Sequence, residues 1–310
     1  MNRWHKFLLK KFISVNDKLV MPHYRQKWVE VEGIERFTDI PYIDDGNFYH
    51  LLDVYRPKNA EGKLPVVIDI HGGAWVYGDK GCNVNYMEGI AKAGYVAVNI
   101  SYRLIPEGVC PKNIQDIFAA FNWTLENIGR YGGDIENIYL TGDSAGAHLS
   151  SFALSALADP ELAALLDVKS DIKFNAAGLT CGVFNIDFFK KLKLPVVRAL
   201  FRMFLGEDYK TSPILPYLTV YNNKVENFPP IFLNTGHADF VRRESRKLYK
   251  FLKEKGVECE LLDMDNQNRR HKLVHCYSVL LPQYEESQYT TEKMLAFFKK
   301  YQKAAAEPIV

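Results

Sequence analysis

The chain has 310 residues, of which 47% are hydrophobic, 13% aromatic and 25% charged. This composition can bury a large core, which excludes disordered, collagen-like and low-complexity chains. The 39 basic and 37 acidic side chains give a formal net charge of +2, without the basic excess of a dedicated nucleic-acid-binding protein, so we expect no nucleic-acid partner.

Residues 1–28 combine basic side chains with an apolar stripe. The segment holds seven basic residues against one acidic residue, and its apolar residues recur at helical spacing: Trp4, Phe7, Leu8 and Phe12. Two interpretations follow, a helix on a membrane surface or a helix laid across the protein body with its charged face in water. We favour the second, because a long apolar face on a soluble protein usually packs on its own core, and we expect no membrane contact.

Beyond this segment, apolar strand-like runs alternate with amphipathic helical stretches. Strands are predicted at 29–41, 48–56, 64–70, 95–102, 137–142, 174–180, 229–235 and 257–264. Helices are predicted at 83–93, 113–128, 145–157, 241–255 and 290–303. Such alternation after an opening pair of strands implies a mostly parallel, twisted sheet of about eight strands, with an antiparallel edge and helices on both faces. We predict a single α/β domain over residues 1–310.

One interval breaks this alternation. Residues 181–228 form a long connection that is rich in Phe, Leu and Lys and has helical periodicity. A connection of this length is usually a lid or an added subdomain, so we predict a small helical cap. Its phenylalanines Phe184, Phe188 and Phe189 either wall an apolar acyl or aryl pocket or pack the cap on the core.

The cysteines and the apolar runs bear on location and metal content. The five cysteines are spread without a CxxC motif, and neither HExxH nor a Cys/His cluster occurs. This usage fits reduced, buried thiols and predicts no metal site. The chain also lacks an apolar run of 18 residues and the features of a signal peptide, so we expect a cytoplasmic protein.

The segment Gly142–Gly146 has the sequence Gly-Asp-Ser-Ala-Gly and lies between a predicted strand and a predicted helix. Gly-x-Ser-x-Gly alone is a weak signal, and a plain glycine-rich turn would also fit it. The strand–turn–helix context favours a nucleophile elbow, in which glycines let the helix approach the strand and the serine hydroxyl is exposed. We therefore predict Ser144 as a nucleophile.

A serine hydroxyl is a weak nucleophile at neutral pH, so the elbow implies a base and a carboxylate that orients it. In this architecture the acid precedes the histidine in the chain. Asp239 follows the strand that ends at Gly236, although it could instead cap the next helix. Among eight histidines, His148 would lie behind the elbow and His271 stands in a basic stretch, whereas His275 is flanked by apolar residues. We predict Asp239 as the orienting acid and His275 as the base.

A glycine-rich turn, His71-Gly-Gly-Ala-Trp75, directly follows a predicted apolar strand. Acyl transfer passes through a tetrahedral oxyanion, which fixed backbone N–H donors stabilise by about 3 to 4 kcal/mol each. Glycine allows the backbone to come that close. We predict Gly73, Ala74 and Ala145 as the oxyanion donors and His71 as a loop-shaping residue, with an ordinary turn as the alternative.

These motifs resemble those of the α/β-hydrolase superfamily, in particular its hormone-sensitive-lipase-like and BD-FAE-like carboxylesterases. The resemblance runs from about residue 45 to the C-terminus and rests on His71-Gly-Gly-Ala-Trp75, Ser101-Tyr-Arg-Leu-Ile-Pro-Glu107, Gly142-Asp-Ser-Ala-Gly146, Gly236-His-Ala-Asp239 and His275. It implies the α/β-hydrolase fold and a serine esterase that acts on small carboxylic esters without a cofactor. Two positions depart from the familiar patterns: Ala74 replaces a third glycine, and His275-Cys276-Tyr277 replaces His-Gly-Phe.

Together these observations predict a carboxylic ester hydrolase in which Ser144, Asp239 and His275 act through an acyl-enzyme on esters of short acyl chains. Alternatives with the same machinery are an arylformamidase, a carbohydrate-ester (acetyl or feruloyl) esterase and a peptidase. A non-catalytic ligand-binding relative and a membrane-surface lipase are further alternatives. The expected partner is a small-molecule ester, and a homo-oligomer is compatible with the sequence.

Overall fold

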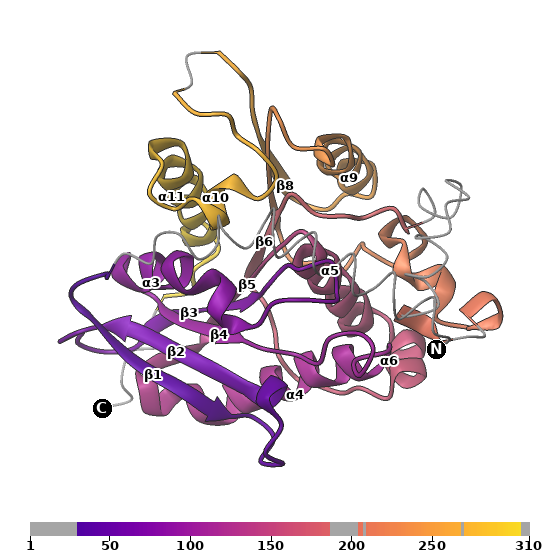
Figure 1. Cartoon of the computed structure of the whole chain (residues 1–310), viewed down its shortest axis with the longest axis horizontal. Coiled ribbons are helices and arrows are strands. Elements are labelled where there is room, and N and C mark those ends of the chain that lie inside the picture. The colour runs from indigo at the N-terminus through magenta and orange to yellow at the C-terminus, as the bar shows by residue number, and fades with distance from the viewer. Residues whose placement is uncertain (1–29, 187–203, 207–208, 268–269, 305–310) are drawn as a thin grey trace.

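The computed structural model describes residues 30–186, 204–206, 209–267 and 270–304, and these form a sheet with helices on both sides (Figure 1). The predicted N-terminal helix over 1–28 lies outside the described residues. The eight strands of the sheet are β1 (Ile34–Pro41), β2 (Leu51–Pro57), β3 (Leu64–Ile70), β4 (Val96–Ile100), β5 (Gly133–Asp143), β6 (Ala176–Thr180), β7 (Ile231–Gly236) and β8 (Cys259–Met264).

The sheet has the strand order β1-β2-β4-β3-β5-β6-β7-β8. Strand β2 pairs antiparallel with β1 and β4, and all the other pairs are parallel. The predicted α/β class with an antiparallel edge is therefore confirmed. All five residues of β4 are buried, because a parallel sheet covered on both faces selects continuous apolar strands rather than alternating ones.

The described helices are α3 (Val84–Lys92), α4 (Lys112–Asn127), α5 (Ala145–Ala158), α6 (Pro160–Leu166), α9 (Arg242–Glu254), α10 (Tyr277–Leu280) and α11 (Glu285–Lys299). The sequence did not predict α6 and α10. Helix α11 begins five residues before its predicted start at 290. The prediction missed these residues because the first turn is acidic, which suits a helix N-terminus but carries no apolar periodicity. No single described helix is long and apolar enough to cross a membrane; α5 and α6 pass that test only as a pair bent by 117°.

Neighbouring residues of one strand enter different cores. Val66 and Ile68 of β3 pack with α4, α5 and α9, whereas Val67 packs on the other side with α3 and α11. This division follows from the two-residue side-chain period of a strand. Strand β5 leads directly into α5 (Figure 1), so the core on the side of α4, α5 and α9 determines the position of that helix.

The parallel strands end in register at one edge of the sheet. Ile70 at the end of β3 pairs with Gly142 of β5, Asp143 pairs with Thr180, and Gly236 pairs with Met264 of β8. The loops that follow β3, β5, β7 and β8 therefore emerge side by side. In open α/β sheets this carboxyl edge is where ligands bind.

Only part of the predicted cap lies among the described residues, since 187–203 and 207–208 are not described. The described part holds three short 3₁₀ turns, η4 (Tyr209–Thr211), η5 (Leu215–Leu218) and η6 (Val220–Asn222). Phe184 is fully buried in the hydrophobic core, which is the packing role that the sequence left open. Phe188 and Phe189 fall outside the described residues.

Candidate active site

Ser144 occupies the single residue between β5 and α5, in a sharp turn with φ 51°. Its two flanking glycines are sterically required. A Cβ on Gly142 would lie 2.6 Å from the hydroxyl of Ser150, and one on Gly146 would lie 1.9 Å from the carbonyl oxygen of Ile70. The strained backbone at Ser144 thus occurs where α5 closely approaches β3. The sharp turn leaves the serine half-exposed at the carboxyl edge of the sheet.

The three side chains that were predicted to act together lie in one hydrogen-bonded chain. Nε2 of His275 lies 2.8 Å from the Oγ of Ser144. Nδ1 of the same ring lies 2.7 Å from Oδ1 of Asp239. Asp239 follows β7, and His275 belongs to the loop between β8 and α10. A carboxylate at Nδ1 requires that nitrogen to donate, which leaves the Nε2 lone pair facing the serine hydroxyl.

The Asp239 carboxylate is buried and receives further hydrogen bonds besides that from His275. Its Oδ2 accepts from the Thr235 hydroxyl at 2.8 Å, and its Oδ1 accepts from the backbone N–H of Val241 at 3.1 Å. Burial alone would raise its pKa, but these bonds and His275 outweigh it, so the pKa of Asp239 lies below its ordinary value. The N-cap residue of α9 is Val241 and not Asp239, so the alternative of a helix cap is wrong, and the bond to the Val241 N–H belongs to the turn before the helix.

The loop after β3 has a backbone shape that few residues can adopt. Gly73 has φ 120°, and a Cβ there would lie 1.9 Å from the carbonyl oxygen of Tyr77. Ala74 follows at φ 49°. The N–H groups of Gly73 and Ala74 donate to no acceptor among the described residues, and Ala145 is the first residue of α5, where an N–H has no partner within the helix. These three donors remain available to an anion.

One polar residue at this edge was missed by the sequence analysis. Oδ1 of Asp143 accepts the backbone N–H of Gly72 at 2.8 Å and the side-chain amide of Asn83 at 3.0 Å. The residue before Ser144 therefore ties the elbow to the loop after β3. An acid at the end of an otherwise apolar strand was the sequence signal for this residue, although its partners depend on the fold.

The side chain of His271 is 36% exposed, and its other contacts are with α11 and the residue before that helix. Its Nδ1 lies 3.0 Å from Oε2 of Glu286, and its ring stacks on Tyr284 with centroids 3.7 Å apart. Glu286 also accepts the backbone N–H of Arg270 at 3.0 Å. Burial alone would raise its pKa, but the bonds from His271 and the backbone outweigh it and lower the pKa of Glu286 to about 2. This acid of α11 holds the loop that carries His275.

An exposed aromatic ring lies next to the imidazole of His275. Phe240 is 78% exposed, and its ring centroid lies 4.4 Å from that of His275. A single exposed apolar side chain is common on protein surfaces, so the relevance of Phe240 rests on its contact with His275. This position could not be predicted from the sequence, since Phe240 follows Asp239 in a loop without periodicity.

Two thiols lie close to the same imidazole. The ligand atoms of Cys181, His275 and Cys276 all lie within 4.8 Å of one another. Thiolates and imidazole are the ligands that zinc prefers. However, both ring nitrogens of His275 already contact Asp239 and Ser144, and burial raises the pKa of Cys181 and Cys276, which disfavours the thiolate form. We therefore assign no metal to this cluster.

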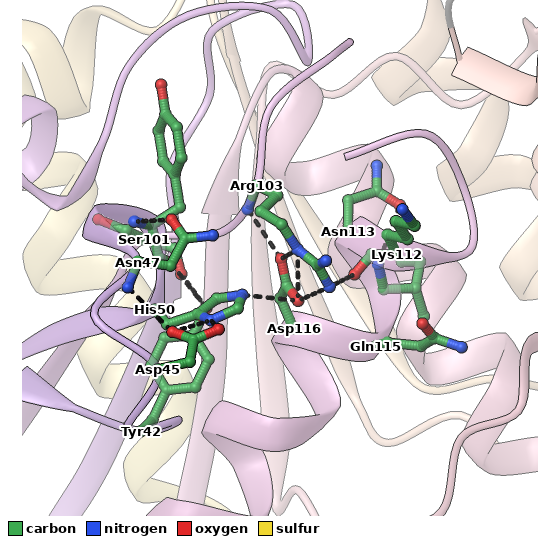
Figure 2. A network of polar contacts seen from close by, with 12 residues as sticks. Tyr42, Asp45, Asn47, His50, Ser101, Arg103, Lys112, Asn113, Gln115 and Asp116 are labelled. Carbon is green, nitrogen blue, oxygen red and sulfur yellow. Dashed lines mark hydrogen bonds and ion pairs between the residues drawn. The ribbon is translucent and has the colours of Figure 1, made fainter. Parts of the chain in front are cut away.

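A separate polar network anchors the segment after β4 (Figure 2). The buried carboxylate of Asp116 accepts from the backbone N–H of Arg103 at 2.9 Å and from its Nε at 2.8 Å. His50 lies between two acids, 2.9 Å from Asp45 and 3.2 Å from Asp116. Two residues beyond Arg103, the N–H of Ile105 donates to the Trp75 carbonyl at 2.9 Å. The network thus supports the loop after β3 from the side.

Comparison with known proteins gives a consistent group of relatives. The family model described as BD-FAE matches residues 52–252. The chain is 31% identical over 206 residues to the "Probable carboxylic ester hydrolase LipM" of Mycobacterium tuberculosis, covering 65% of this chain and 47% of LipM. It is 30% identical over 238 residues to "Carboxylesterase NlhH" of the same species, covering 74% of this chain and 70% of NlhH. The chain spans about half the length of LipM and of "Esterase LipQ".

Among solved structures, Esterase B from Lactobacillus rhamnosis is similar with a TM-score of 0.87 and 26% identity, covering 96% of each chain. A structure of the same esterase that carries a C4-C4 tributyrin phosphonate is 27% identical, also with a TM-score of 0.87. The structure titled "Bacterial Heroin Esterase" has a TM-score of 0.72 at 20% identity and covers 95% of this chain, a similarity of fold alone.

Proposed function

The chain belongs to the BD-FAE family of the α/β-hydrolase superfamily, and on that premise we propose that it is a serine esterase that hydrolyses small carboxylic esters of short acyl chains. The observation that carries the proposal is the continuous contact from Ser144 through His275 to Asp239, at 2.8 Å and 2.7 Å. Donor–acceptor distances of this size suit proton transfer between nucleophile and base.

In the proposed reaction, the Ser144 oxygen attacks the ester carbonyl carbon while Nε2 of His275 takes the hydroxyl proton. The resulting oxyanion binds the N–H groups of Gly73, Ala74 and Ala145. Collapse breaks the bond to the alkoxy group, which leaves as an alcohol with the proton from His275, and an acyl-serine remains. Water then attacks the acyl carbon while giving a proton to His275. Collapse of this second intermediate breaks the acyl–Oγ bond, returns the proton from His275 to Ser144 and releases the carboxylic acid.

Asp239 keeps its charge through this cycle. Its lowered pKa maintains a carboxylate beside Nδ1 when the ring becomes an imidazolium, and that carboxylate stabilises the cation without itself taking the proton. The proposed mechanism therefore uses only groups of the chain and water.

The preference for a short, apolar acyl group is supported by two observations. Phe240 offers an exposed ring at the rim of the site, 4.4 Å from that of His275, on which apolar substrate atoms can pack. The structurally similar Esterase B carries a tributyrin phosphonate, a C4 compound, in one of its structures.

The test is labelling with a fluorophosphonate, followed by rates on acetyl, butyryl, longer acyl, feruloyl and N-formyl substrates. We expect labelling at Ser144 and the highest kcat/KM on acetyl or butyryl esters. Ser144→Ala should lose labelling and lower kcat for p-nitrophenyl acetate by about 10⁴-fold or more, with an unchanged Tm. Near wild-type turnover by Ser144→Ala would refute the assignment. A preference for feruloyl substrates or for long chains would refute the short-chain part alone, whereas a preference for N-formyl substrates would refute the esterase in favour of an amide hydrolase.

A further inference from the structure

His148 makes two hydrogen bonds that join separate parts of the site. Its Nδ1 accepts from the indole N–H of Trp75 at 3.2 Å. Its Nε2 lies 2.9 Å from the carbonyl oxygen of Leu218 in η5. The histidine itself lies on α5, one turn after the nucleophile, with its backbone N–H 3.2 Å from the Ser144 carbonyl. One ring therefore contacts the loop after β3 and a described part of the predicted cap.

These partners determine the state of the ring. A carbonyl oxygen can only accept, so Nε2 of His148 must carry the proton, and Nδ1 must offer a lone pair to the indole of Trp75. The side chain is buried. Burial lowers the pKa of His148 to about 4, so the ring is neutral at physiological pH and can accept and donate at once.

Trp75 needs such support because its backbone is strained. Trp75 has φ 64° and follows Ala74 at φ 49°, and both values lie in the left-handed region that bulky residues avoid. Strain of this kind persists only where the surroundings hold the residue firmly. Besides its bond to His148, the buried indole packs edge-on against Phe204, and the Trp75 carbonyl accepts from Ile105.

We propose that His148 is a positioning residue that holds Trp75, and through it the Gly73 and Ala74 N–H groups, at a fixed place relative to Ser144. The proposal rests on the proposed esterase function. Nucleophile and His148 share one helix, so the hydrogen bond to Trp75 transmits the position of α5 to the oxyanion donors. Because displacements of about 1 Å at such sites cost on the order of 10²-fold in rate, loss of this bond impairs the transition state more than substrate binding.

The matched variants are His148→Leu, which removes both hydrogen bonds, and His148→Gln, whose amide can accept from Trp75 and donate to Leu218. We expect His148→Leu to lower kcat by about 10- to 100-fold with KM within about threefold of wild type. Its affinity for a boronic acid, which forms a tetrahedral adduct on serine, should fall by the same factor as kcat/KM. His148→Gln should recover most of the rate.

Trp75→Phe tests the same hydrogen bond from its other side, since phenylalanine lacks the indole donor. It should show the same loss of kcat, and combining it with His148→Leu should add little further loss. Hydrogen exchange of the Trp75 indole N–H, assigned by its disappearance in Trp75→Phe, reports the contact without any substrate. We expect strong protection in the wild-type protein and rapid exchange in His148→Leu.

The two proposals fail in different ways. An inactive wild-type protein whose indole protection depends on His148 would refute the esterase but not the contact. An active enzyme in which His148→Leu or Trp75→Phe keeps the wild-type kcat and boronate affinity would refute the positioning role. A uniform rise in KM at constant kcat would refute it equally.

Discussion

In the proposed reaction Asp239 orients His275, and its two carboxylate oxygens have different partners. Oδ1 faces Nδ1 of His275 and Oδ2 faces the hydroxyl of Thr235. An amide at this position would keep the shape of the side chain, but the proposed reaction needs the negative charge of the carboxylate. His275 therefore needs the negative charge of the carboxylate as well as its hydrogen bond.

Asp239→Asn should lower kcat by about 10⁴-fold at neutral pH, because an amide N–H next to Nδ1 favours the wrong tautomer of His275 and no longer stabilises the imidazolium. Thr235→Val is the matched control, since it removes only the bond to Oδ2 of Asp239, and it should cost less than about tenfold. Initial rates and Tm measured in parallel separate catalysis from folding. Equal losses in the two variants would contradict this role of the charge.

The sequence indicated the three proposed catalytic residues because the proposed chemistry confines each of them to a motif or to a position after a strand. Both departures from the familiar motifs, Ala74 and Cys276, have positive φ, at 49° and 55°, where glycine is the usual residue. Both positions thus have a backbone shape that glycine adopts more readily than alanine or cysteine does. The contacts of Asp143 with Gly72 could not be predicted, since they depend on how β5 meets the loop after β3.

At the scale of elements, the loop between β8 and α10 depends on α11 for its position. Glu286 of α11 accepts the backbone N–H of Arg270 and contacts the ring of His271, four residues before His275. Apolar periodicity predicted the second half of α11 but not its first turn. The acid that holds the loop lies in that first turn, so its role could not be predicted from the sequence.

Glu286→Gln should destabilise the protein at neutral pH and not in strong acid. The pKa of Glu286 is about 2 in the folded state against 4.5 ordinarily. Its stabilising contribution is therefore fully present above about 4.5 and is lost as the pH falls toward about 2. We expect a Tm deficit of about 2 to 4 °C at pH 7 that shrinks steadily between pH 5 and pH 2.

Glu285→Gln is the control for this experiment. Glu285 is exposed and pairs with the exposed side chain of Arg270 at 2.8 Å, and surface pairs of this kind contribute little to stability. Its Tm should match that of wild type at every pH. A deficit of Glu286→Gln that stays constant from pH 7 to pH 2 would show that the charge of Glu286 is not responsible.

For the whole molecule, the sheet brings together groups that lie far apart in the chain. Ser144 follows β5, Asp239 follows β7, His275 follows β8 and the loop that is proposed to bind the oxyanion follows β3. The alternation of strands and helices predicted the parallel sheet with its antiparallel edge. The strand order could not be predicted from it, because the place of β4 between β2 and β3 depends on packing of both faces and not on local pattern.

This arrangement supplies a donor or acceptor on the chain for every proton transfer of the proposed reaction, so activity should not depend on a metal ion. After exhaustive dialysis against EDTA, we expect initial rates on p-nitrophenyl acetate within about twofold of the untreated protein. The rates are measured together with the metal content of the sample. A loss of more than about tenfold that a divalent cation restores would contradict the prediction. In that case Cys276→Ala tells whether the cation acts at the cluster of Cys181, His275 and Cys276, because removing one of three ligands should abolish the restoration there and leave it intact for a site elsewhere.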